Sequence, residues 1–226
     1  MIPYQQYAKN ILHKDSVFII CCMVITLSVT LASAYFHTGY WTAFTLAIGM
    51  YAIISFYAFF TKEKFLQRLL LFGIVAGFVE LYADCWLVHN VASLVYPANE
   101  PKLACSPNYM PFAWAVVLIE VGYLGWCISN KVKMFEAMLL CMLIGIFFIP
   151  VFEQCAYWAN WWYYNPCKML LNTPWYIIVA EGIICFFLPA IFYLEVKYHW
   201  LSAFLLGLFE GIVIFLAYCV TYYLLA

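Results

Sequence analysis

EQCAYWANWWYYNPCKMLLNTPWYIIVAEG, residues 153–182, joins two long apolar runs of the chain through an aromatic loop. The first run ends near Glu153, and the second begins at Pro174 and carries Glu181 within its first two turns. Trp and Tyr favour the headgroup region of a bilayer, whereas a carboxyl group inside a membrane segment is costly and usually serves a function. The stretch therefore predicts two membrane helices with an acidic, ring-lined site near the loop between them.

Composition extends this prediction to the whole chain. Of the 226 residues, 68% are hydrophobic and only 9% are charged, and the mean hydropathy is +0.94. A soluble domain of this size could not bury so much apolar surface, so we expect the lipid bilayer to be its solvent. A net charge of −1 without a basic run argues against nucleic acid as a partner. The whole chain, residues 1–226, is predicted to form a single transmembrane helical domain.

Seven apolar segments are long enough to cross a hydrocarbon core of ~30 Å as helices, which rise 1.5 Å per residue. The sequence therefore predicts an all-α, polytopic membrane protein with seven transmembrane helices. They are expected at Ser16–Tyr35, Gly39–Phe60, Phe65–Asn90, Pro111–Ser129, Met134–Cys155, Pro174–Leu194 and Leu201–Leu225.

The basic residues predict the orientation of these helices. Two of the ten fall on one side of the predicted topology, Lys102 and Lys168, and the other eight fall on the opposite side, at Lys9, Lys14, Lys62, Lys64, Arg68, Lys131, Lys133 and Lys197. Because basic residues are enriched in cytoplasmic loops, we expect a cytoplasmic N-terminus and a C-terminus outside or in a lumen. The membrane could be the endoplasmic reticulum or a bacterial plasma membrane.

The two long non-cytoplasmic loops, Val91–Met110 and Ala156–Thr173, suggest an internal repeat. Around each loop a helix carrying acids leads into an aromatic segment, and the next helix begins at a proline and carries another glutamate. Two similar hairpins of the same orientation predict a parallel repeat about the membrane normal, with a site between the halves. Proline also suits the first turn of any helix, so the prolines alone do not establish the repeat.

Carboxyl groups inside the predicted helices are the candidate catalytic residues. No Lys or Arg lies at matching depth, so buried acids there are expected to stay protonated and to serve as proton donors. Interhelical hydrogen bonding is the alternative role, and we favour it for Glu153 and Glu210. Asp84 could orient Glu80 or lie at the interface. The candidate catalytic residues are Glu80 and Glu181 first, then Glu120, with Asp84 as a partner.

The sequence lacks the residues that several other catalytic chemistries require. The four histidines, His13, His37, His89 and His199, lie at expected helix ends or in loops and form no cluster for iron, haem or zinc. Asp15 and Asp84 are the only aspartates, so no Asp-rich pair could bind Mg²⁺ and a diphosphate. We therefore expect no metal and no cofactor.

Aromatic rings accompany the acids and complete the predicted site. Acids beside aromatic faces suit protonation of an alkene or epoxide, after which cation–π contacts stabilise the carbocation by ~0.5–2 kcal/mol per ring. A headgroup-level aromatic belt is an equally good explanation for any single ring. The candidate substrate-binding residues are Trp86, Tyr109, Trp114, Trp158, Trp162, Tyr163 and Trp175.

Short motifs around these acids resemble a known family. The run Trp162-Tyr163-Tyr164 with Pro166, the run Leu171-Asn172-Thr173-Pro174, and Glu181-Gly182 resemble the integral-membrane terpene cyclases of fungal meroterpenoid and indole-diterpene pathways. Glu80 followed by Leu94-Val95-Tyr96-Pro97 is similar to the other acidic motif of that family. The resemblance covers about the central half of the chain, and the membrane lycopene cyclases are more distantly similar.

The resemblance implies seven helices and a terpenoid-forming isomerase or lyase. Such an enzyme protonates the epoxide or terminal alkene of a hydrophobic prenylated small molecule and cyclises it without metal. By position, Glu80 and Glu181 correspond to the two essential acids of the family. The chain departs from the family at Glu181, where Asp is usual, and at Val79, where Trp is usual; these departures bear on pocket shape and substrate.

Two alternatives remain open at the level of the sequence. A sterol isomerase or sterol-binding protein like the emopamil-binding family needs a histidine at its site, for which His89 is the candidate. A proton-coupled transporter or lipid-binding scaffold would also use intramembrane acids. A cyclase requires one ring-lined pocket holding Glu80 and Glu181, whereas a transporter requires access from both faces.

The ten cysteines are scattered and suggest no metal or redox motif. Cys105 and Cys167 take comparable positions in the two outer loops, so they could form a disulfide, although buried free thiols are the simpler expectation. The sequence does not predict the oligomeric state.

Overall fold

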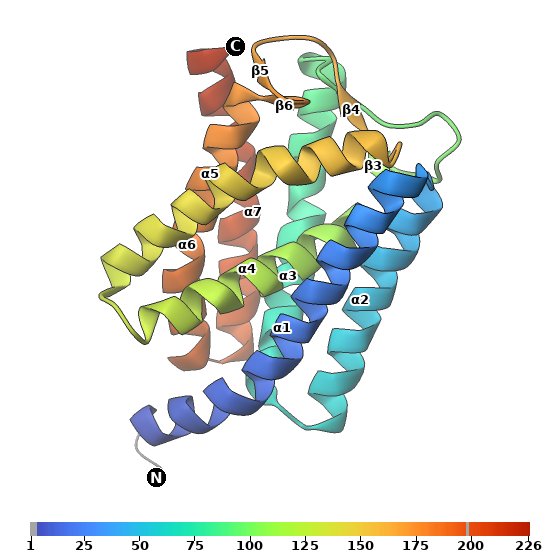
Figure 1. Cartoon of the computed structure of the whole chain (residues 1–226). Helices are drawn as coiled ribbons and strands as arrows, with labels where there is room; N and C mark the ends of the chain where they lie inside the picture. Colours follow the sequence, from blue (N-terminus) through green and yellow to red (C-terminus); the bar gives the residue numbers. More distant parts are fainter. Residues whose placement is uncertain (1–3, 198) are drawn as a thin grey trace.

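The computed structural model describes the backbone of residues 4–197 and 199–226 and the side chains of residues 15–195 and 199–226. Seven long helices form an all-α bundle (Figure 1). Their bounds are α1 (Tyr4–Phe36), α2 (Tyr40–Phe60), α3 (Lys64–Cys85), α4 (Met110–Ser129), α5 (Met134–Trp158), α6 (Trp175–Lys197) and α7 (Trp200–Leu225).

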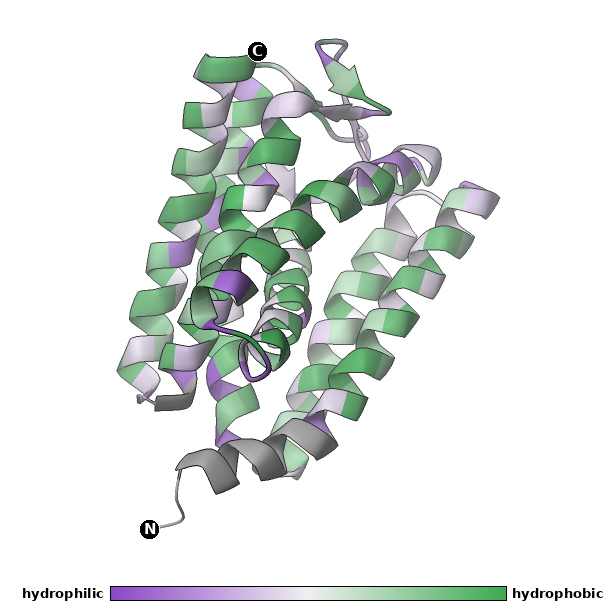
Figure 2. Ribbon diagram, turned by 60° about the vertical axis from the view of Figure 1, so that its left-hand side comes forward, coloured by the Kyte–Doolittle hydropathy of each residue, from purple (hydrophilic) through white to green (hydrophobic). Residues whose placement is uncertain are grey.

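All seven helices are long and apolar enough to cross a membrane. Hydrophobic colouring covers most of the length of the helices, and hydrophilic colouring appears at helix ends, in the connecting loops and in a few bands within the helices (Figure 2). Large apolar side chains such as Phe56, Phe60 and Phe147 are mostly exposed, as lipid-facing residues are. The architecture is compatible with a multi-pass membrane protein.

The predicted helix bounds agree with the structure within a few residues, with one clear exception. Helix α1 begins at Tyr4, about three turns before the predicted start at Ser16, because the polar lead-in is itself helical. That segment contains good helix formers such as Gln, Ala, Leu and Lys and contains no Gly or Pro. The side chains of Lys9, Lys14 and Lys197, on which the predicted orientation partly rests, lie outside the described residues.

Helix α3 ends in a single π-helical turn, η1 (Trp86–Asn90). Such turns insert one residue into an α-helix and are frequent at functional sites. Helix α3 also packs closely against two neighbours through glycines. A Cβ on Gly77 would lie 2.2 Å from the backbone oxygen of Pro111 in α4, and one on Gly211 of α7 would lie 2.4 Å from the Cβ of Val79.

The two long loops lie together at one end of the bundle, called here the loop end, and they contain six two-residue strands (Figure 1). Strand β1 (Leu94–Val95) of the first loop pairs antiparallel with β4 (Tyr163–Tyr164) of the second. Each loop then forms a tight hairpin, β2 (Lys102–Leu103) with β3 (Ser106–Pro107), and β5 (Met169–Leu170) with β6 (Thr173–Pro174). The strand pair β1–β4 joins the two loops directly.

A disulfide links Cys85 at the end of α3 to Cys105 in the first hairpin. The suggested pairing of Cys105 with Cys167 is therefore wrong, and so is the expectation that Cys105 is a free thiol. Cys167 is exposed and free. The hairpin folds back over the end of its own preceding helix, which brings Cys105 to Cys85 instead of to the other loop.

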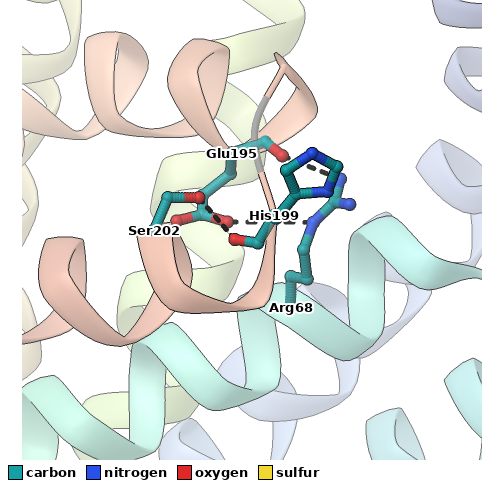
Figure 3. Close-up of polar contacts among 4 residues, drawn as sticks. All are labelled: Arg68, Glu195, His199 and Ser202. Carbon is teal, nitrogen blue, oxygen red and sulfur yellow. Dashed lines mark hydrogen bonds and ion pairs between the residues drawn. The ribbon is translucent and has the colours of Figure 1, made fainter.

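At the opposite end, an arginine ties the start of α3 to the end of α6 (Figure 3). Arg68 Nη2 donates a 2.7 Å hydrogen bond to the backbone oxygen of Glu195, and Arg68 Nε lies 3.9 Å from Glu195 Oε2. In the following turn, Ser202 Oγ donates to the backbone oxygen of His199. The Arg68 contacts join α3 to α6, and the Ser202 contact lies at the start of α7.

Candidate functional site

Four carboxyl groups from three helices gather in the half of the bundle nearest the loop end. Glu80 and Asp84 lie one turn apart on α3, Glu153 lies on α5 and Glu181 lies on α6. The side chain of Glu80 interacts electrostatically with Asp84 and Glu181, and that of Glu153 interacts with Glu181 and Asp84. We call these four residues the carboxyl cluster. The structure thus brings together three of the four candidate catalytic residues and adds Glu153.

The members of the carboxyl cluster are enclosed by protein to different extents. Glu80 is fully buried, Asp84 and Glu153 are buried, and Glu181 keeps part of its surface accessible. No described Lys or Arg side chain forms an ion pair with any of the four. Close carboxyl groups without cationic partners repel one another when ionised, so the cluster favours a state that retains protons.

Asp84 is held by two hydrogen bonds from the first loop. Its Oδ2 accepts one from Tyr96 Oη and one from Ser106 Oγ, each 2.6 Å long. The Cys85–Cys105 disulfide lies directly beside Asp84 and Ser106, since Cys85 follows Asp84 and Cys105 precedes Ser106. The disulfide therefore fixes the hairpin that supplies the serine hydroxyl.

Glu153 and Glu181 each accept one hydrogen bond from an aromatic side chain. Trp162 Nε1 donates to Glu153 Oε2 over 2.6 Å, and Tyr218 Oη of α7 donates to Glu181 Oε1 over 2.6 Å. Glu80 differs from the other three because neither of its carboxyl oxygens forms a hydrogen bond within the described part of the chain. Asp84 and Trp114 adjoin Glu80 without reaching hydrogen-bond geometry.

Two tyrosines from the loops close the cluster at the loop end. Burial, followed by repulsion from Asp84 and Glu80, raises the pKa of Tyr96 well above its ordinary value of 10. Burial, followed by repulsion from Glu153, raises the pKa of Tyr164 in the same direction. Both phenols therefore stay protonated and available as hydrogen-bond donors at neutral pH.

Two grooves of the structure differ from the predicted ring-lined pocket between Glu80 and Glu181. One open groove of about 370 Å³ lies between α1 and α2, and a second of about 610 Å³ lies between α3 and α7. Neither is lined by a member of the carboxyl cluster. Glu80, Asp84 and Glu153 are buried, and Glu181 is partly accessible.

Glu120 does not belong to the cluster. Its carboxyl accepts a 2.9 Å hydrogen bond from Thr26 of α1, so it faces a different neighbour. The prediction that Glu120 shares a site with Glu80 and Glu181 is not supported by its contacts. Trp114, six residues before Glu120 on α4, is the residue that adjoins Glu80. Six residues rotate a side chain by about 240° around the helix, at 100° per residue, and shift it by about 9 Å along the axis. Glu120 therefore faces a different neighbour from Trp114 and lies deeper in the bundle.

The predicted substrate-binding rings divide into two groups. Trp114 and Trp162 lie at the carboxyl cluster, and Trp162 also packs edge-on against Tyr96 at 6.4 Å. The other five lie elsewhere. Tyr109 is buried and packs against Phe44, and Trp86 lines the groove between α3 and α7. The remaining three rings are exposed and fit the alternative of an aromatic belt: Trp158, Tyr163 and Trp175.

Sequence reasoning missed one member of the carboxyl cluster, Glu153, and several residues that surround it. Tyr96 and Tyr164 stand inside the motifs that carry the family resemblance, so their place in those motifs was the available signal. Glu153 opens the decisive stretch but was assigned to interhelical bonding. Nothing in the sequence singles out Ser106 or Tyr218, because a folded hairpin and the packing of α7 bring them to the acids.

Within the described residues, no group of three or more His, Cys, Asp or Glu side chains is arranged to hold a metal ion. His89 is exposed and lines the groove between α3 and α7, apart from the carboxyl cluster. His89, the candidate for the histidine that a sterol isomerase of the emopamil-binding type requires, therefore does not lie at this site.

The fold is an all-α bundle of seven helices long and apolar enough to cross a membrane, and the site is a cluster of mostly buried carboxyl groups near one end. The chain belongs to the family described as a domain of unknown function, DUF6989, whose sequence model matches residues 81–225. That region includes Asp84, Glu153 and Glu181 and begins one residue after Glu80. No curated protein and no solved structure shows significant similarity to the chain.

Proposed function

We propose that the chain is an integral-membrane terpene cyclase. In this proposal it protonates an epoxide or alkene of a prenyl chain and cyclises the chain through carbocations, without metal. The observation that carries the proposal is the carboxyl cluster: four acids without cationic partners, enclosed among helices and bordered by Trp and Tyr rings. The short motifs similar to those of fungal membrane cyclases contribute two of the four acids.

The hydrogen bonds assign a role to Glu80. A hydrogen-bond donor stabilises the ionised form of the carboxyl group that accepts the bond. Asp84, Glu153 and Glu181 each accept at least one such hydrogen bond. Glu80 has none and is fully buried, so it is the member best suited to remain a neutral acid. Glu80 is therefore the proposed proton donor.

The proposed reaction is balanced within the cluster. Glu80 transfers its proton to the epoxide oxygen, whose C–O bond breaks, or to an alkene carbon. The π electrons of the prenyl chain then form the new C–C bonds. The last carbocation loses a proton to the Glu181 carboxylate, the proton returns to Glu80 through the cluster, and the product is an isomer of the substrate. Trp114 and Trp162 supply ring faces beside the acids, each worth ~0.5–2 kcal/mol to a nearby cation.

A parallel repeat underlies the site in this proposal, and three features support it. Both loops follow the order strand, tight hairpin, helix, and the hairpin turns carry residues with positive φ, Ala104 and Leu171. Leu171 stands 67 residues after Ala104, and Glu181 stands 67 residues after Trp114. The antiparallel pair β1–β4 is what a two-fold axis between the halves would produce. In this register Trp114, instead of Glu120, is the counterpart of Glu181.

The proposed orientation places the N-terminus in the cytoplasm and the loop end outside or in a lumen. The bias of Lys and Arg supports it, and so does the disulfide, since disulfides persist in oxidising compartments. The membrane is then the endoplasmic reticulum or a bacterial plasma membrane.

Substitution of the acids tests the proposal. We expect Glu80→Gln and Glu181→Gln each to abolish formation of the cyclised isomer, because neither amide can exchange a proton with the substrate. Glu120→Gln is the matched control, a buried glutamate on α4 that contacts α1 instead of the cluster. Product is measured by mass spectrometry of lipid extracts, with the folded fraction of each variant measured by size exclusion in detergent. Full turnover by Glu80→Gln would remove that residue from the role of donor.

A proton-coupled transporter is the second candidate, and Glu210 is the observation that favours it. Glu210 lies in the middle of α7, is fully buried without a hydrogen-bond partner, and interacts electrostatically with Glu181. It extends the row of acids from the loop end toward the bilayer centre, as in a proton relay. Proton flux into liposomes that contain the protein distinguishes the two functions, because a cyclase has no reason to conduct protons.

A further inference from the structure

The groove between α3 and α7 changes from apolar to polar along its length. At its inner end it is lined by Val79, Ile212 and Phe215, and at the loop end by His89 and Asn90. From Val79 to Asn90 the groove follows eleven residues of α3 and η1, or about 16 Å at 1.5 Å per residue. Its volume of about 610 Å³ is in the range of small-molecule binding sites.

Both ends of the groove are structurally defined. At the inner end α3 and α7 meet so closely that a Cβ on Gly211 would lie 2.4 Å from that of Val79, so the groove cannot continue deeper between them. At the loop end the ring of Trp86 is held edge-on by Tyr222, with the ring centres 5.4 Å apart. The π-helical turn η1 carries His89 and Asn90 at the mouth.

We infer that this groove binds a single-chain amphiphile, with its hydrocarbon chain pointing inward and a compact, uncharged, hydrogen-bonding head, such as a phenol or alcohol, at His89 and Asn90. The apolar walls match a hydrocarbon chain, and an imidazole and an amide offer donors and acceptors to a neutral head. No Lys or Arg lines the groove, so it lacks the basic residues that bind phosphate headgroups.

The inference deepens the proposed function and rests on it for the identity of the amphiphile. Val79, at the inner end of the groove, directly precedes Glu80, so the far end of a bound chain lies at the depth of the proposed proton donor. A prenylated phenol bound in this way presents the end of its chain, and not its ring, at that depth. The groove is then the site where the substrate loads from the bilayer.

Photolabelling tests the site and the orientation of its occupant. Two probes are used with the full chain in detergent, a farnesyl phenol with a diazirine at the far end of the chain and one with the diazirine on the ring. We expect the chain-end probe to label the segments around Val79 and Ile212, and the ring probe to label His89 and Asn90. Labelling in the opposite sense, or none in the groove, overturns the inference.

A matched pair of variants shows whether the label reports this groove. Ile212→Trp fills it, and we expect labelling to fall by about tenfold or more, equivalent to ~1.4 kcal/mol. The control is Leu216→Trp. Leu216 lies one turn further along α7 and does not line the groove, and its side chain is 52% exposed against 51% for Ile212. Labelling of this variant should match that of the wild type. Equal labelling of both variants, or equal competition by phosphatidylcholine, shows only general lipid contact and overturns the inference.

The same experiment separates this inference from the proposed function. It is run on Glu80→Gln, which binds without turnover under the proposal. Groove labelling of Glu80→Gln, together with no cyclised product from any prenylated phenol with the wild type, would leave the binding site standing and refute the cyclase. Turnover by the wild type without groove labelling would leave the cyclase standing and refute the groove.

Discussion

Asp84 shows what a single carboxyl group in this fold depends on. Its two donors come from opposite arms of the first loop, and both approach the same oxygen. A carboxyl in an apolar segment is visible in the sequence as a functional candidate, and Glu80, Asp84 and Glu181 were predicted in this way. The donors were not predictable from the sequence. Tyr96 and Ser106 reach the acid through the folded path of the loop, and no local sequence pattern indicates that path.

Removal of one of these donors should destabilise the protein. We expect Tyr96→Phe to lower the free energy of unfolding by about 1–2 kcal/mol, because the buried Asp84 carboxyl loses a charge-stabilising hydrogen bond. Tyr82→Phe is the control, since Tyr82 is largely exposed on the same side of the bundle. Both are measured by denaturant unfolding in detergent. Equal stability of the two variants would mean that the Tyr96 bond contributes nothing.

Glu100, in the first loop, should make stability depend on pH. Burial raises its pKa from 4.5 to about 7, although the hydrogen bond from Tyr109 and the attraction of Lys102 both act to lower it. Between pH 4.5 and 7 the folded state therefore holds a proton that the unfolded state has lost, so stability falls as pH rises through this window. At pH 7 and above the loss reaches up to about 3 kcal/mol.

Glu100→Gln is expected to remove this loss, because an amide does not titrate. Unfolding curves at pH 5 and pH 8 should then differ less for the variant than for the wild type. Asn99→Ala, an exposed neighbour without a titrating group, should keep the wild-type difference. An unchanged pH dependence in Glu100→Gln would show that other groups cause it.

At the scale of the element, the helices were predictable and the strands were not. An apolar run of twenty residues marks a membrane helix directly, and the predicted bounds of α2, α4 and α7 are correct within one residue. The strands are two residues long, too short for an alternating pattern, and β1 pairs with β4 from the distant second loop. The early start of α1 was missed because its first turns are polar.

Helix contacts in this bundle depend on small residues, and Gly77 is the clearest case. We expect Gly77→Ala to cost about 1–3 kcal/mol, because its Cβ would lie 2.2 Å from the backbone of Pro111 and α3 and α4 would have to separate. Gly49→Ala in α2 meets nothing within 4 Å and should be neutral or stabilising by up to about 1 kcal/mol. Thermal unfolding of both variants measures the difference, and a stable Gly77→Ala would refute the close contact.

At the scale of the whole molecule, the site is a product of how the two loops and seven helices assemble. The sequence predicted that Glu80 and Glu181 belong to one site, but it placed Glu120 there and assigned Glu153 elsewhere. Depth along a helix was readable from the sequence, whereas the face that each helix turns to its neighbours was not, because all seven are apolar on every side. The pairing of the two loops decides which faces meet, and it brings α3, α5 and α6 to one cluster of acids.

The most direct test of the account is the product formed by the purified protein from prenylated phenols with a terminal epoxide. Chromatography with mass spectrometry should reveal a new compound of unchanged mass with the wild type and with Glu120→Gln, and none with Glu80→Gln. If the wild type leaves every such substrate unchanged, or if Glu80→Gln forms the same isomer at the same rate, the carboxyl cluster does not initiate cyclisation.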